Sequence, residues 1–243
     1  MDHTTLHLWR VGPRHVPAAV ARMGLDRLRL RHAPGLRFHK LLGTGSGRTF
    51  SPRDADPLVW ALLCTWTDRG AADAFEAHPT PRGWRRIAHE EWRADLGCLR
   101  TKGRWSRSSP FCVDPGLSGW EGPVASITRA RLAPRHLGTF WQAVPPVVAD
   151  LAHDGPLLRL GIGEAPVGVQ GTFTVWRDAE ALTDFAYRRT AHRTAIADTD
   201  RLGWYAEELF ARFALLAQRG TVFGATLPLP PSGLGPTTGD PDA

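Results

Sequence analysis

Two stretches of the chain share one order of apolar and polar positions. In the first, the extended apolar segment LHLWRV at 6–11 leads through Pro13-Arg14-His15 into residues with helical apolar spacing. In the second, VASITRARL at 124–132 leads through Pro134-Arg135-His136 into a similar segment. The pattern therefore predicts a strand followed by a helix at both places.

Further landmarks repeat in the same order after these helices. Each half continues with a Gly-x-Gly turn, a strand ending in Trp, a Trp-x-Asp sequence opening a helix that carries a Phe, a Glu-Glu helix and a last strand. In the first half these are 43–45, 60–66, Asp68 with Phe75, 90–91 and 96–103. In the second half they are 161–163, 171–176, Asp178 with Phe185, 207–208 and 221–228.

The repeated order β-α-β-β-α-(α)-β predicts an α+β fold made of two ferredoxin-like halves. A four-stranded sheet with helices on one face leaves its other face bare, and two such sheets can bury these faces against each other. We therefore expect an intramolecular version of the dimeric α+β barrel. Its expected parts are a first half at 1–105, a linker at 106–123, a second half at 124–227 and a disordered tail at 228–243.

The halves differ in the polarity of one strand face. Alternate residues of the strand at 60–66 are Trp60, Leu62, Cys64 and Trp66, and the matching residues are Gln170, Thr172, Thr174 and Trp176. Likewise, Arg129 stands where the first half has Leu8. Such a polar face either meets solvent or lines a pocket that binds a polar or charged group.

Composition narrows the class of protein. The net charge is +6, but the arginines are scattered and form no basic tail or stripe, so we expect no nucleic-acid partner. No apolar run is long enough for a membrane helix, and the N-terminus lacks the pattern of a signal peptide, so we expect a cytoplasmic protein. Three irregularly spaced cysteines predict neither a disulfide framework nor a zinc site.

Other motifs are less informative. The glycines of GTGSG at 43–47 lack the Gly-Lys-Ser/Thr ending of a phosphate loop and predict a turn between strands. The segment WYAEELFARF at 204–213 has helical apolar spacing, which places Glu207 and Glu208 on the outside or against arginines. His192 shares a helical face with Phe185, and a histidine there is more often a surface residue than a ligand.

Several of these segments resemble the spheroidene monooxygenase family, which oxygenates acyclic carotenoids and is associated with haem. The resemblance covers about Leu36 to Gly224, and its most specific motifs are FAYRRTAHRTAI at 185–196 and WYAEELFARF. The other segments are FHKLLGTGSGRTFSPRDADPLVWALL at 38–63, VASITRARL, and GIGEAPVGVQGTFTVW at 161–176. The family implies the same tandem ferredoxin-like barrel, which other haem proteins such as aldoxime dehydratases also use.

The resemblance implies haem b as the cofactor and His192 as its axial ligand. Arginines at the rim would pair with the haem propionates, and Arg129 is also a candidate for a distal role beside the iron. Gln170, Thr172 and Thr174 would supply distal hydrogen bonds. The candidate propionate partners are Arg129, Arg188, Arg189 and Arg193. The candidate aromatic lining of an apolar tunnel is Phe140, Trp141, Phe173 and Trp176.

Three functions follow as hypotheses. The first is a haem-dependent oxygenase acting on an apolar small molecule, with a separate redox partner because the chain has no electron-transfer domain of its own. The second is a haem enzyme of another reaction type, such as aldoxime dehydration or nitrogen–heteroatom chemistry. The third is a cofactor-free barrel that binds an apolar ligand. A monomer and a homodimer are both compatible with a barrel completed within one chain.

Overall fold

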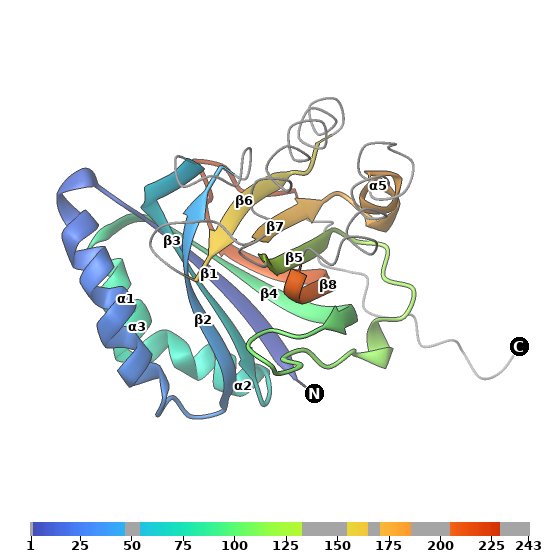
Figure 1. The fold of residues 1–243 in the computed structure, drawn as a ribbon, viewed down its shortest axis with the longest axis horizontal. Coiled ribbons are helices and arrows are strands. Elements are labelled where there is room, and N and C mark those ends of the chain that lie inside the picture. The colour runs from blue at the N-terminus through green and yellow to red at the C-terminus, as the bar shows by residue number, and fades with distance from the viewer. Residues whose placement is uncertain (1, 47–53, 133–154, 165–170, 186–204, 229–243) are drawn as a thin grey trace, which may run out of the picture.

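The sheet of this protein is a closed barrel of eight strands in the order β1-β3-β2-β6-β7-β5-β8-β4. The structure is a computed structural model, and it describes residues 2–46, 54–132, 155–164, 171–185 and 205–228. Gln170, Arg188, Arg189, His192 and Arg193 lie outside these ranges. Figure 1 shows helices α1, α2 and α3 along one side of the barrel and α5 on the opposite side.

Each half contributes four antiparallel strands, in the order expected of a ferredoxin-like unit. Equivalent strands pair in equivalent register, since His3 faces Trp66 in the first half and Val124 faces Trp176 in the second. The predicted duplicated α+β barrel is thereby confirmed. The strands are β1 (His3–Val11), β2 (Leu36–Gly45), β3 (Ala55–Trp66), β4 (Ala88–Gly103), β5 (Val124–Leu132), β6 (Leu158–Gly163), β7 (Gly171–Trp176) and β8 (Tyr205–Gly220).

The two Gly-x-Gly motifs join the halves along one seam of the barrel. Strands β2 and β6 pair antiparallel, with Gly43 opposite Gly163 and Gly45 opposite Gly161. The prediction of turns at these motifs was therefore wrong. With no side chains, these glycines let the two edge strands of the halves approach closely.

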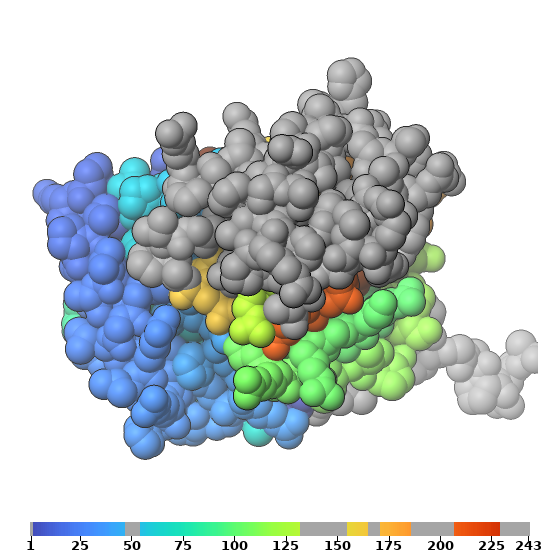
Figure 2. All heavy atoms as spheres, viewed as in Figure 1, coloured from blue at the N-terminus to red at the C-terminus, as the bar shows by residue number. Residues whose placement is uncertain are grey.

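The other seam is formed by β4 and β8, which are the longest strands of the barrel. Both predicted Glu-Glu helices are wrong, because Glu90 and Glu91 lie in β4 and Glu207 and Glu208 lie in β8. The predicted last strand at 221–228 is also wrong, since β8 ends at Gly220 and a turn follows. Figure 2 shows the green residues that follow β4 in surface contact with the orange-red β8.

Each of these long strands ends in a tight turn that a glutamate of the other half holds. After β4, the backbone N–H groups of Ser106 and Arg107 donate to the Glu207 carboxylate at 3.0 and 2.7 Å. After β8, the N–H of Gly224 donates to Glu90 at 2.7 Å. Consecutive residues with positive φ, such as Ser106 at 53° and Arg107 at 64°, form a concave nest of N–H groups that suits an anion. The repeated glutamates thus clamp the halves to each other.

Replacing Gly103 with alanine is expected to lower the free energy of unfolding by about 2 kcal/mol, because backbone strain at one residue costs this order of energy. Its φ is +93°, and an added Cβ would meet the carbonyl oxygen of Glu208 at 2.2 Å. Urea unfolding measures the loss. Gly24→Ala in α1 is the control, since a Cβ there meets nothing within 4 Å and stability should hold or rise. Equal stability of both variants would contradict the expectation.

Two apolar cores lie on opposite sides of the first-half sheet. Inside the barrel, residues such as Leu6, Leu63 and Phe173 pack together. Outside it, Trp9, Trp60 and their neighbours pack beneath the helices. Asp68 caps the second of these helices through the Ala71 N–H at 2.9 Å. The helical elements here are η1 (Pro13–His15), α1 (Val16–Leu30), α2 (Arg69–Ala74), η3 (Phe75–Ala77) and α3 (Pro79–Arg85).

In its described residues, the second half has a capped helix at the place that matches α2 of the first half. Helix α5 (Ala179–Thr183) is capped by Asp178, which accepts from the Ala181 N–H at 2.7 Å. Phe185 stacks on Trp176 at 5.1 Å between ring centroids, as Phe75 packs on Trp66 at 4.7 Å. The Trp-x-Asp landmark of the sequence is therefore a strand end and a helix cap in both halves. No helix in the described ranges is long and apolar enough to cross a membrane.

Candidate functional site

The candidate site is the outer face of the second-half sheet. Phe173 and Val175 point into the barrel core, so strand alternation places Thr172 and Thr174 of β7 on the outside. By the same alternation around Ile127, strand β5 presents Ser126, Thr128 and Ala130 on this face. Strand β8 adds Phe210 and Arg212, which lie opposite Thr128 and Ser126.

Three side chains on this face are smaller than their first-half counterparts. The pairing register aligns Thr128 with His7, and Ala130 with Trp9. It also aligns Thr172 with Leu62. Replacing a tryptophan by alanine removes one of the largest side chains available to a core. At these positions the strands of the second half therefore carry less side-chain volume than those of the first half.

Exposure confirms that the two faces differ. In the first half Trp9, His7 and Leu62 are 0% exposed, and Arg93 is 2% exposed. In the second half Phe210, which matches Arg93, is 37% exposed, and Thr128 is exposed. The half-exposed residues of this face are Ser126, Ala130, Thr172 and Arg212. A sheet face on which several polar groups are exposed is a candidate ligand site, because such groups fix the orientation of a ligand.

The threonines have different surroundings. Thr174 is buried, and its hydroxyl lies 2.7 Å from Ser126 Oγ and accepts from Trp176 Nε1 at 2.8 Å. Trp176 is itself 2% exposed and stacked on Phe185. Thr174 thus positions its neighbours. Within the described residues the Thr172 hydroxyl has no hydrogen-bond partner, so it is available to a ligand.

Arg129 lies on the opposite side of the sheet from the threonines. It is 4% exposed, points to the barrel interior as Leu8 does in the first half, and contacts the Trp105 ring at 5.5 Å. Its guanidinium donates to Glu164 at 2.8 Å and to Glu207. The structure therefore does not bring Arg129 together with Thr172 and Thr174. Phe173 and Trp176 likewise point to opposite faces and cannot line one tunnel together.

The carboxylates around Arg129 are held ionised. Burial opposes this, but hydrogen bonds from Lys40 and Trp105, at 2.8 and 2.7 Å, and the charges of Lys40 and Arg129 lower the pKa of Glu164. For Glu207, burial is again outweighed, and the N–H groups of the nest together with Arg129 lower the pKa. This end of the barrel is therefore a satisfied ion-pair network, although Arg129 Nε is buried without a partner.

The first-half outer face carries its own buried charge network. Arg93 donates to Asp95 at 2.6 Å and to Glu76 at 2.7 Å, and His3 contacts Asp95 at 2.9 Å. Burial raises the pKa of Asp95, but the hydrogen bonds and charges of His3 and Arg93 lower it more strongly. The resulting pKa is about 2. Beside this network His7 is fully buried, and desolvation lowers its pKa to about 4. On the outer face of the first-half sheet, the chain's own buried side chains thus occupy the positions that are more exposed in the second half.

The sequence analysis identified Thr172 and Thr174 but missed five members of this face, Arg212 among them. Ser126, Thr128, Ala130 and Phe210 were overlooked, although an alignment of 6–11 with 127–132 pairs Trp9 with Ala130. Phe210 and Arg212 were assigned to a helix, which hid their alternation. Among the described residues no group of three or more His, Cys, Asp or Glu is placed to hold a metal ion.

The fold and this face define a class: a tandem ferredoxin-like barrel in which the described outer sheet face of one half is more polar and more exposed than that of the other. Within that class the chain belongs to the spheroidene monooxygenase family, and it is a monooxygenase-type enzyme. It is 34% identical over 228 residues to the spheroidene monooxygenase of Rhodobacter capsulatus, covering 92% of this chain and 94% of that protein. It is 29% identical to the spheroidene monooxygenase of Cereibacter sphaeroides, and this match covers 83% of this chain and 62% of that protein.

Solved structures support the fold. An aldoxime dehydratase aligns with a TM-score of 0.53 at 11% identity, covering 88% of this chain and 81% of that chain. A second aldoxime dehydratase, in complex with butyraldoxime, has the same TM-score at 10% identity, covering 88% of this chain and 79% of that chain. At such identity the likeness concerns the fold alone. No protein-family model matches the chain.

Proposed function

We propose that this enzyme is a haem-dependent oxygenase of an apolar polyene, the class of substrate in the name of its relatives. The observation that carries the proposal is the outer face of the second-half sheet. Its described side chains are more polar and more exposed at positions where the first-half counterparts are large and buried. The face lies at β5, β7 and β8, across the barrel from α1 (Figure 1).

The chemistry of the described residues supports haem b. Ala130, Thr128 and Thr172 are small where the first half has Trp9, His7 and Leu62, and the exposed ring of Phe210 offers a flat macrocycle an apolar surface. Arg212, which has no ion pair within the described residues, would pair with a propionate. His192 remains our proposed axial ligand, with Arg188, Arg189 and Arg193 as further propionate partners, and all four lie outside the described ranges.

When bound, haem supplies an iron that can activate dioxygen. The chain's own residues then have two tasks. The Thr172 hydroxyl, and that of Thr128 beside it, donate hydrogen bonds toward a polar ligand atom above the sheet. Thr174 and Ser126 hold each other and Trp176, which fixes the end of β7. Incorporating one oxygen atom and releasing the other as water needs two electrons and two protons, so we include a separate reductant protein as a partner.

A haem enzyme that dehydrates an oxime is the second candidate. The observation in its favour is the group of hydroxyls on the site face, formed by Ser126, Thr128, Thr172 and Thr174, since a polar ligand would need such partners. This reaction consumes no electrons overall. Turnover of an oxime by the reduced protein without a continuing supply of reductant would favour this candidate, and strict dependence on a continuing supply would favour the oxygenase.

The experiment that tests the cofactor is an absorption spectrum of protein produced with haem supplied. We expect a Soret band in the wild type and its loss or shift in His192→Ala, because removal of the axial imidazole changes the iron's ligand field. His32→Ala, at an exposed position, is the control and should keep the band. A protein without the band would overturn the haem proposal and leave the cofactor-free barrel.

A further inference from the structure

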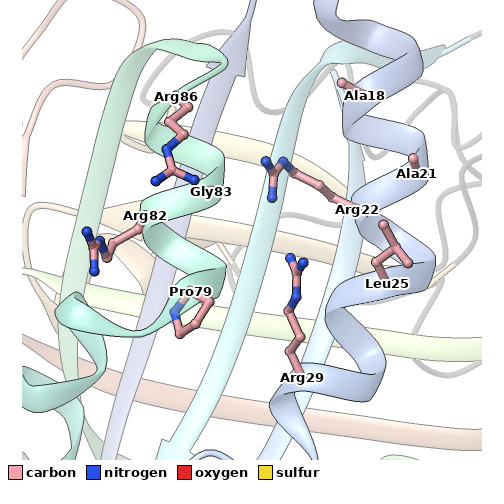
Figure 3. Close-up of a pocket in the computed structure, with 9 residues that line it drawn as sticks. All are labelled: Ala18, Ala21, Arg22, Leu25, Arg29, Pro79, Arg82, Gly83 and Arg86. Atoms are coloured by element: carbon pink, nitrogen blue, oxygen red, sulfur yellow. The ribbon is translucent and has the colours of Figure 1, made fainter.

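A hollow lies between α1 and α3, on the side of the barrel opposite the candidate site. It has a volume of about 440 Å³ and is lined by apolar residues, among them Ala18, Ala21, Leu25 and Pro79, and by arginines. Figure 3 shows Arg22 extending from α1 toward α3 with Arg29 beneath it, while Arg86 lies along α3 and Arg82 points away from α1. We call this hollow the arginine groove. It shares no residue with the candidate active site.

The positive charge of the groove is mostly uncompensated. Arg29 contacts the buried carboxylate of Asp26 at 2.9 Å. Arg22, Arg82 and Arg86 have no ion pair within the described part of the chain. Guanidinium groups gathered along one groove repel each other, and this repulsion is relieved when an anion binds between them.

Arg22 packs closely against a glycine of α3. A Cβ added to Gly83 would meet the Arg22 Nη1 at 2.2 Å. The Arg22 Nε is buried and has no hydrogen-bond partner among the residues that the structure describes. The guanidinium is therefore fixed by packing with unused donor capacity, whereas a solvated surface arginine would extend into water. Such a preorganised donor loses little entropy on binding an anion.

We propose that the arginine groove binds a phosphate or diphosphate group, carried by a ligand whose apolar part packs on Ala18, Ala21, Leu25 and Pro79. Guanidinium donors match the oxygens of a phosphate in geometry as well as in charge. The apolar wall adds affinity for the ligand's organic part. A soluble phosphorylated metabolite and a phospholipid headgroup present the same chemistry, and the experiment separates them. The proposal does not depend on the haem or on the reaction.

The test titrates inorganic pyrophosphate into the protein by calorimetry, and in a second arm sediments the protein with vesicles of neutral or anionic phospholipid. Arg22→Gln/Arg86→Gln is expected to weaken binding about 100-fold, at roughly tenfold for each lost charge-assisted bond. Gly83→Ala removes no charge but displaces the Arg22 guanidinium, and it should weaken binding about tenfold. As control, Arg14→Gln/Arg31→Gln removes the same charge from exposed positions outside the groove.

Each outcome decides the proposal. A soluble ligand is supported if pyrophosphate binds and if the groove variants weaken this binding while the control variant retains it. Sedimentation with anionic vesicles alone, sensitive to the same variants, supports a lipid headgroup. The proposal is overturned if neither probe binds, or if the control weakens binding as much as the groove variants, which would indicate only the general positive charge of the protein. Thermal unfolding of each variant shows that it is folded.

Discussion

Replacing Arg129 with leucine is expected to lower the free energy of unfolding by about 3 kcal/mol near neutral pH, because it removes the buried countercharge of two half-buried carboxylates and leaves Glu164 with Lys40 alone. Leucine is the residue that the first half has at this position, so the substitution suits the strand. Arg129 is 4% exposed and contacts both Glu164 and Glu207. Urea unfolding measures the change.

The pH dependence of this loss follows from the carboxylates. The folded state lowers the pKa of Glu164 and Glu207, so their contribution to stability is present above the unfolded pKa, about 4.3, and is lost as pH falls through the folded values. The difference between Arg129→Leu and wild type should therefore shrink in acid. A difference that stays constant down to about pH 3 would contradict the role of these ion pairs, since the carboxylates of the unfolded chain are then largely protonated.

Arg10 provides the matched control. It is half-exposed and lies 3.9 Å from Glu90, which is the first-half equivalent of Glu207. Arg10→Leu should change stability by less than about 1 kcal/mol, as exposed ion pairs do. The triple variant Arg129→Leu/Glu164→Gln/Glu207→Gln should recover part of the loss, because it removes the uncompensated charges together with their partner. A triple variant less stable than Arg129→Leu would show that the carboxylates act independently of Arg129.

The repeat made most of the fold predictable from the sequence. Alternating segments at 6–11, 124–132 and 171–176 are strands of the barrel, and both Trp-x-Asp sequences begin helices. The helices expected around the Glu-Glu pairs failed for a physical reason. Glu90 and Glu91 place charged groups on both faces at the start of β4, so its two-residue apolar period begins only at Trp92, from which Trp92, Ala94, Leu96 and Cys98 face the barrel core.

The spacing within β8 misled in a similar way. Leu209 and Phe213 face the barrel core, while Phe210 lies on the outer face. Apolar residues on both faces of this strand therefore produce the same three- and four-residue spacing as the apolar face of a helix. Arg129 was recognised as unusual, but its direction depends on Glu164 and Glu207, which are distant in the chain. Strand alternation does place Thr172 and Thr174 on one face, which is why these residues were predictable.

Filling the second-half face should remove the active site without unfolding the protein. Ala130→Trp restores the side chain that Trp9 provides in the first half, at a position that is half-exposed and can accept it. We expect turnover and cofactor binding to fall at least about 100-fold, because a ring of this size occupies the proposed ligand space. The free energy of unfolding should change by less than about 1 kcal/mol, as for most substitutions outside a packed core.

Two comparisons separate a blocked site from a damaged protein. Ala130→Ser changes the same position by one small atom and should keep both cofactor and turnover. Thr172→Leu, which copies Leu62, should weaken ligand binding through its lost hydroxyl and added bulk while the Thr174–Trp176 hydrogen bond persists. If Ala130→Trp retains full cofactor binding with an unchanged spectrum, the haem does not lie on this face. The open surface would then need another occupant, because its polar, half-exposed groups distinguish it from the filled first-half face on any account of the reaction.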